Sequence, residues 1–224
     1  MSKIVAVIGS SQTGKTRLIE RLVPELKKRG RTVAVIKHCP HGFLFDVEGK
    51  DSHRLFQAGA DGVAMAGPDL TAVVKRRSDV NDLRRIARAY FRDADIVLIE
   101  GGKGITGFRN IEILRKGISH EPAGAPSELA ALVTDFAVES DKPVLDFENI
   151  PAVAEFIEKN IPDEDDDVIL EVDGTLIPIK DFVRSFLKNT ILGMIGALRG
   201  VEQGSRHIQI GILRREEEEK DEKL

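Results

Sequence analysis

The chain has 224 residues, enough for one ordinary domain with a small addition and too few for two ordinary domains. Its 42% hydrophobic residues can form a core, and a net charge of -4 gives no general attraction to nucleic acid or to a membrane, so we expect neither as a partner. Cys39 is the only cysteine, and the sequence opens without an apolar leader or membrane-spanning run, so we expect a cytoplasmic protein without an intramolecular disulfide.

The first three elements predict the fold class. Ile4 to Ile8 is a continuous run rich in β-branched residues, typical of a central parallel strand that is buried on both faces. Apolar residues at three- and four-residue steps predict a helix from Lys15 to Arg29, with Gly30 at its C-terminal cap. A second strand from Thr32 to Lys37 completes a βαβ unit, so the expected class is α/β, with a mostly parallel, P-loop NTPase-like sheet flanked by helices.

Shorter patterns predict the rest of a main domain at residues 1–162. Strands are expected at 62–66, 71–74, 96–99, 111–114, 130–134 and 144–147, and helices at 51–58, 81–91 and 151–160. Asp51 is a suitable N-cap for the first of these helices.

An acidic run at 163–167 is expected to be a solvated linker that does not pack, and a small module follows at 168–213. This module should have a hairpin around Asp173-Gly174, a helix at 181–198 and a third strand at 208–213. The helix has one apolar stripe, which we expect to lie on the main domain or on a second subunit. Residues 214–224 should form a frayed, charged tail.

The turn after the first strand fits the P-loop pattern GxxxxGK(S/T), with the strand before it and the helix after it that this pattern requires. Backbone N–H groups and the start of the helix would surround phosphate. Lys15 would reach the β- and γ-phosphates, and the Thr16 hydroxyl would bind Mg²⁺. The expected nucleotide contacts are Gly9, Ser11, Gln12, Thr13, Gly14, Lys15, Thr16 and Arg17.

Glu100 ends a second buried strand at the edge where open α/β sheets bind ligands. It is the candidate Walker B acid, able to hold Mg²⁺ directly or through water, or to position an attacking water. With Lys15 and Thr16 it completes the expected catalytic set. An ordinary acid at a strand end would fit the same position, although Gly101 and Gly102 beside it favour a function.

The segment from Lys37 to Asp46 leaves the second strand at the same edge. We expect His38 to contact phosphate or substrate and Asp46 to be a further acid near Mg²⁺, while plain solvated loop residues would fit equally well. A zinc site at His38, Cys39 and His41 is less favoured, because they crowd one loop without a CxxC or a partner pair elsewhere.

Asp135 follows another apolar strand, and its carboxylate could accept hydrogen bonds from N1 and N2 of guanine. Adenine has an acceptor at N1 and no amino group at C2, so such an acid would select GTP over ATP. A turn aspartate after a strand is the equally simple alternative.

The ordered series of motifs resembles the molybdopterin-guanine dinucleotide biosynthesis protein B (MobB) family from about Lys3 to Asn160. The series comprises the P-loop, Lys37-His38, the segment 49–54 with Ala58-Gly59-Ala60, Val97 to Gly101, and Val133-Thr134-Asp135. The resemblance implies a homodimer, GTP with Mg²⁺, weak GTP hydrolysis, and partnership with the MobA-type guanylyltransferase that joins GMP to molybdopterin. The family pattern differs at Gly102 and at Arg109-Asn110, and the segment from Val168 to Leu213 lies outside its common core.

Four functions remain open at this point. The protein could be mainly an adaptor that hydrolyses GTP slowly, which we favour, or an enzyme whose purpose is that hydrolysis. An ATP-dependent small-molecule synthetase or kinase remains, because a P-loop alone chooses neither base nor acceptor. A nickel-delivering GTPase is weaker, since its metal would need a fuller cysteine and histidine set.

Overall fold

The computed structural model describes residues 2–44, 47–76, 83–101, 106–164, 168–172, 175–198 and 208–212. The chain divides into two compact units, residues 1–165 and residues 166–224. None of the helices in these described ranges is long and apolar enough to cross a membrane.

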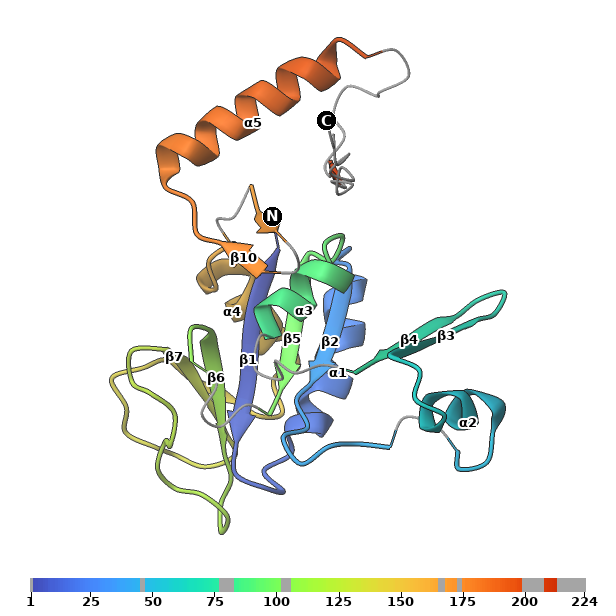
Figure 1. The fold of residues 1–224 in the computed structure, drawn as a ribbon. Coiled ribbons are helices and arrows are strands. Elements are labelled where there is room, and N and C mark those ends of the chain that lie inside the picture. The colour runs from blue at the N-terminus through green and yellow to red at the C-terminus, as the bar shows by residue number, and fades with distance from the viewer. Residues whose placement is uncertain are drawn as a thin grey trace, which may run out of the picture. The chain divides into compact units, whose positions relative to one another are not determined.

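The first unit is built on a six-stranded sheet in the order β2-β5-β1-β6-β7-β8, in which every neighbouring pair is parallel. Its strands are β1 (Lys3–Gly9), β2 (Val33–Lys37), β5 (Ile96–Glu100), β6 (Arg109–Leu114), β7 (Leu129–Thr134) and β8 (Val144–Asp146). This arrangement confirms the predicted α/β class. Because β1 lies inside the sheet, the turn that follows it opens at the middle of the carboxyl edge (Figure 1).

Alternate residues of β1 belong to two separate cores, which explains why the whole strand is apolar. Val5 and Val7 pack with the buried faces of α1 (Lys15–Lys28) and α4 (Ile150–Asn160). Ile4, Ala6 and Ile8 pack on the opposite side with α3 (Leu83–Tyr90). Helices therefore cover both faces of the sheet (Figure 1).

Between β2 and α3 the chain forms α2 (Asp51–Gln57) and an antiparallel ribbon of β3 (Gly62–Ala66) and β4 (Thr71–Lys75) (Figure 1). The prediction that Asp51 caps α2 is wrong: Lys50 occupies the N-cap position, and its side chain makes no capping hydrogen bond to the helix. Asp51 is the first helical residue instead, where its charge still complements the positive helix start.

The acidic run after α4 is partly packed, contrary to the expectation of a solvated linker. Glu164 donates its backbone N–H to the carbonyl of Ser2, and its carboxylate pairs with Arg84 and, at 3.7 Å, with Arg88. Asp163 lies 3.5 Å from the Lys3 ammonium group. Arginines of α3 therefore compensate charges that could not pack alone; residues 165–167 of the run lie outside the described residues.

The second unit contains the predicted hairpin, with β9 (Leu170–Val172) antiparallel to β10 (Thr175–Ile177), followed by α5 (Asp181–Gly196). The predicted third strand is wrong over residues 208–212, which have no strand structure. An apolar run becomes a strand only when its backbone groups find a ladder partner. No residue of α5 is buried, and Phe182 and Phe186 are 80% and 60% exposed.

Candidate functional site

The turn between β1 and α1 has the backbone geometry of a phosphate-binding loop. Gly9, Gln12 and Gly14 all have positive φ, at 151°, 64° and 91°. A Cβ on Gly9 would lie 2.7 Å from the Thr13 hydroxyl and 2.9 Å from the carbonyl of Ile113, so only glycine fits there. Ser11 and Gln12 are exposed at the tip of the loop.

Side chains of the loop hold its shape from within. The Thr13 side chain is fully buried, and its hydroxyl donates to the carbonyl of Ser10 at 2.9 Å. The Lys15 ammonium group donates to the carbonyls of Gly9 and Ser10 at 3.0 and 2.7 Å. The cation therefore lies over the loop, and α1 begins at the same residue, so its positive end faces the same place.

The candidate Walker B acid meets the P-loop directly. Glu100 ends β5 opposite Val7 of β1, and its side chain accepts a hydrogen bond from the Thr16 hydroxyl at 2.5 Å. The Lys37 ammonium group lies 3.8 Å from the same carboxylate oxygen. Glu100 is only 8% exposed. One buried carboxylate beside one hydroxyl is the sparse oxygen set that suits Mg²⁺ held jointly by protein and phosphate.

His38 lies next to this pair at the end of β2. Its backbone N–H donates to the carbonyl of Glu100 at 3.0 Å, and a Cβ on Gly101, whose φ is 101°, would lie 3.4 Å from the His38 carbonyl oxygen. Within the described ranges no three His, Cys, Asp or Glu side chains gather into a metal-binding group. Asp46, the second predicted acid, lies outside the described residues, as does Gly102.

Asp135 follows β7 at the same carboxyl edge, and two groups hold its carboxylate. The backbone N–H of Lys116 donates to Oδ1 at 3.0 Å, and Nε of Arg115 lies 3.4 Å from Oδ2. The Lys116 N–H, with a smaller contribution from the Arg115 charge, lowers the pKa of Asp135. The group is therefore an anion at neutral pH, with one oxygen engaged on each side.

Two residues that sequence reasoning missed connect Asp135 to the P-loop. Phe147, just after β8, is fully buried, and its ring lies where a Cβ on Gly14 would come within 3.1 Å of Cζ. The Arg115 guanidinium lies over the same ring, 4.2 Å from its centroid, and Arg17 approaches it at 5.7 Å. The only signal was positional, since Arg115 follows the strand predicted at 111–114 and Phe147 is the last residue of the strand predicted at 144–147.

A hollow of about 340 Å³ opens beside Asp135. It lies between the ends of β7 and β8 and is lined by Thr134, Asp135, Phe136, Ala137, Val144, Leu145 and Asp146. The carboxyl edge thus carries, side by side, a P-loop with its acid partner and a hollow with an oriented aspartate.

The sequence profile of the family described as molybdopterin guanine dinucleotide synthesis protein B (MobB) matches residues 4–135, which run from the first strand through Asp135. The chain belongs to the MobB family. The molybdopterin-guanine dinucleotide biosynthesis adapter protein of Haemophilus influenzae is 34% identical over 156 residues, which are 69% of this chain and 87% of that protein. The P-loop of this MobB chain is accordingly part of a nucleotide-binding fold.

A solved structure and a longer relative agree with this assignment. A crystal structure titled molybdopterin-guanine biosynthesis protein B (mobB) is 31% identical with a TM-score of 0.54, covering 69% of this chain and 96% of that one. The putative adapter protein of Methanocaldococcus jannaschii is 27% identical over 225 residues, covering 89% of this chain and 93% of its own length. That coverage requires a match that extends into the second unit.

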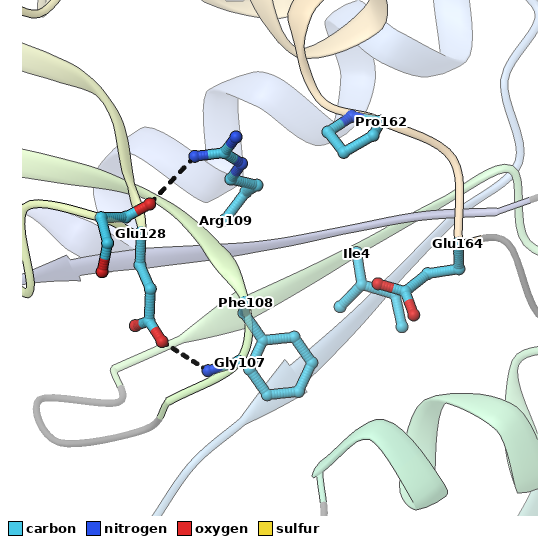
Figure 2. A pocket seen from close by; sticks show the side chains of 8 residues that line it. Ile4, Gly107, Phe108, Arg109, Glu128, Pro162 and Glu164 are labelled. Carbon is cyan, nitrogen blue, oxygen red and sulfur yellow. Dashed lines mark hydrogen bonds between the residues drawn. The ribbon is translucent and has the colours of Figure 1, made fainter. Parts of the chain in front are cut away.

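A second cavity in this MobB chain, of about 290 Å³, lies at the opposite edge of the sheet, where β1 and β6 begin (Figure 2). Phe108 and Glu164 line it, and the Arg84 guanidinium lies over the Phe108 ring at 4.8 Å while pairing with Glu164. Glu128 accepts the backbone N–H of Gly107 at 2.6 Å (Figure 2). The acids that line this cavity are therefore engaged with protein partners, and the cavity lies away from the P-loop.

Glu112 is a buried acid, as many catalytic acids are, but its contacts give it a structural role. It is 2% exposed on β6, and its two oxygens accept the backbone N–H groups of Ala123 and Gly124 at 2.8 and 3.0 Å. The carboxylate thus fastens the loop between β6 and β7 onto the sheet. Arg109 adds a bond to the carbonyl of Ser127 at 3.1 Å, which gives the Arg109-Asn110 stretch a role in holding this loop.

Proposed function

We propose that this chain is a GTP-binding adapter in molybdenum cofactor biosynthesis, which assists the attachment of GMP to molybdopterin to form molybdopterin guanine dinucleotide. The observation that carries the proposal is the joined site at the carboxyl edge. One end is the P-loop with the Thr16–Glu100 pair, and the other is the oriented Asp135 beside its hollow. The names of the relatives as adapter proteins support the cellular role.

At the phosphate end, Lys15 and the start of α1 would neutralise the β- and γ-phosphates, while Gly9, Ser11, Gln12, Thr13, Gly14, Thr16 and Arg17 surround them. Thr16 and Glu100 would hold Mg²⁺, whose charge helps to stabilise negative charge on the phosphates. His38, beside Glu100, would contact phosphate or substrate. Asp46 stays a proposed further acid near the metal.

At the base end, Asp135 would accept the N1–H and N2–H of guanine. Each carboxylate oxygen has two lone pairs, so the contacts to Lys116 and Arg115 leave acceptor capacity for a ligand. Adenine would place an acceptor against the anion, and the mismatch would cost about 1 to 3 kcal/mol for each unmade hydrogen bond. GTP is therefore the proposed nucleotide.

Hydrolysis would be slow and would serve to reset the adapter. Lys15, Thr16 and Glu100 would provide charge stabilisation and water positioning, and an arginine from a partner could accelerate the reaction. The proposed partners are molybdopterin and a MobA-type guanylyltransferase, with the chain acting as a cytoplasmic homodimer. A GTP turnover that rises when the transferase is added would fit the adapter role, whereas a fast reaction by the chain alone would favour an enzyme.

The decisive test is calorimetric titration of GTP and ATP, each with Mg²⁺, into the wild type and Asp135→Ala. We expect tighter binding of GTP, and loss of that preference by about 5- to 100-fold in the variant with ATP affinity unchanged. ATP preference in the wild type would overturn the proposal and support an ATP-dependent synthetase or kinase instead.

A further inference from the structure

We propose that Arg115 is a positioning residue for base selection, which makes the protein discriminate guanine by fixing the carboxylate of Asp135 while resting on the ring of Phe147. This inference rests on the proposed GTP-binding function and adds a residue that lies outside the P-loop. Arg115 does not line the hollow beside Asp135, so its effect on a base must pass through that aspartate.

The first step is the orientation of the carboxylate. Lys116 N–H holds Oδ1 and Arg115 Nε faces Oδ2, so both oxygens have a fixed neighbour and the plane of the group is defined. A base edge with two parallel donors needs that plane in one orientation. An aspartate held at one oxygen alone could rotate, and part of the binding free energy would be lost in ordering it.

The second step is what holds Arg115. Its guanidinium lies 4.2 Å from the centroid of Phe147, a fully buried ring that cannot move without disturbing the core. Its backbone carbonyl accepts the N–H groups of Ile118 and Ser119, both at 3.0 Å, so the turn after β6 is closed around it. Side chain and backbone are therefore both anchored.

The third step is the link to the phosphate end. The Phe147 ring that supports Arg115 also lies directly under Gly14, in the P-loop. A continuous set of contacts thus runs from Gly14 through Phe147 and Arg115 to Asp135. The triphosphate and the base of one nucleotide would be held by a single packed unit, which is the arrangement that preorganised recognition requires.

The test uses the full chain with Mg²⁺ and three nucleotides: GTP, ITP and ATP. ITP has the N1–H of GTP but lacks the 2-amino group, so the GTP to ITP affinity ratio reports on the N2 contact alone. In Arg115→Met we expect both the GTP to ITP and the GTP to ATP ratios to fall about three- to tenfold, with ATP affinity unchanged. ATP affinity also shows that the variant is folded and keeps its phosphate site.

The matched control is Arg76→Met. The Arg76 guanidinium lies 4.1 Å from the centroid of Phe56, which is the same kind of stack but on α2 and not beside Asp135. We expect wild-type affinity ratios in this variant. A double variant, Arg115→Met with Asp135→Ala, should have the same affinity ratios as Asp135→Ala alone, because Arg115 acts through Asp135.

Wild-type ratios in Arg115→Met, an equal loss for all three nucleotides, or additive losses in the double variant would each overturn the inference. Should Arg115→Met not fold, Arg115→Lys keeps a cation but not the planar stack, and a folded Lys variant with wild-type ratios would equally overturn it. A wild type without guanine preference would instead defeat the proposed function itself, so the two failures are distinguishable.

Discussion

The two ends of the candidate nucleotide site are built in different ways. The phosphate end comes from one continuous segment, Gly9 to Arg17, together with a single distant acid, Glu100. The base end is assembled from three separate turns, which carry Arg115, Asp135 and Phe147. Phosphate is recognised chiefly by backbone conformation, whereas a base edge is recognised by the orientation of one side chain.

This difference teaches how the two ends should respond to mutation. Removing the Lys15 cation from a local segment that otherwise depends on backbone N–H groups should lower the affinity for every nucleotide at once. An assembled set that orients one carboxylate should change only the preference among bases. The ratio of GTP to ATP affinity separates the two classes of effect.

Lys15→Ala should give the largest effect and should act on both nucleotides equally. Removing a cation that lies over the loop deletes charge-assisted hydrogen bonds to phosphate, and we expect a loss of about 10- to 100-fold for GTP and for ATP. Titration calorimetry measures both. Lys28→Ala, an exposed lysine in the last turn of the same helix, is the control. A loss of affinity for GTP but not for ATP would contradict the division of the site into two ends.

Gly14→Ala should affect both ends of the site in one variant. The new Cβ would lie 3.1 Å from Phe147 Cζ at a residue with a φ of 91°, so we expect about 1 to 3 kcal/mol of lost stability. Displacement of the ring should also lower the GTP to ATP ratio. Gly30→Ala has similar backbone strain, at a φ of 79°, with nothing within 4 Å, and should leave nucleotide binding intact. Equal GTP to ATP affinity ratios in the two variants would show that the Phe147 ring plays no part in base selection.

The pH dependence of base preference should reveal the ionisation of Asp135. Its pKa lies below the ordinary 3.8, because the Lys116 N–H and the Arg115 charge favour the anion. A lowered pKa stabilises the fold above the unfolded-state value, and that contribution is lost as pH falls through the folded-state value. GTP preference should therefore be constant near neutrality and fade only below the usual aspartate range. In Arg115→Met the fading should begin at higher pH, with ATP binding as the reference at each pH.

Glu158→Gln should give the smallest effect and leave both ends untouched. Glu158 on α4 lies 2.7 Å from Arg31 and 3.2 Å from Arg29, and these hydrogen bonds lower its pKa. We expect about 1 kcal/mol of lost stability in urea denaturation, with normal GTP and ATP affinities. Glu155→Gln, which breaks an exposed pair with Lys159, should cost less. A change in nucleotide affinity would show that α4 communicates with the site.

Prediction from sequence succeeded where the physical cause is local. The apolar run of β1, the stripe of α1 and the P-loop are contiguous, so their structure follows from the order of residues. Phe147 and Arg115 were missed because their contact depends on how β6 and β8 are placed beside α1, which no single segment encodes. Glu164 was misjudged because its arginine partner is 80 residues away. The strand expected at 208–213 failed over its described residues for the same reason, since a strand needs a partner that its own sequence does not name.

The central position of β1 also has a consequence for how the protein is made. Its neighbours are β5 and β6, so Lys3 pairs with Ile96 and Val5 with Arg109. These contacts are far apart along the chain, which makes folding slow, because a long loop must close before any pairing stabilises it. At a synthesis rate of about 5–20 residues per second, the first strand must wait roughly 5 to 20 seconds for both neighbours. The P-loop is among the first residues to leave the ribosome, yet its strand must wait through about 90 residues of synthesis for the first neighbour and stays an exposed apolar segment in that interval.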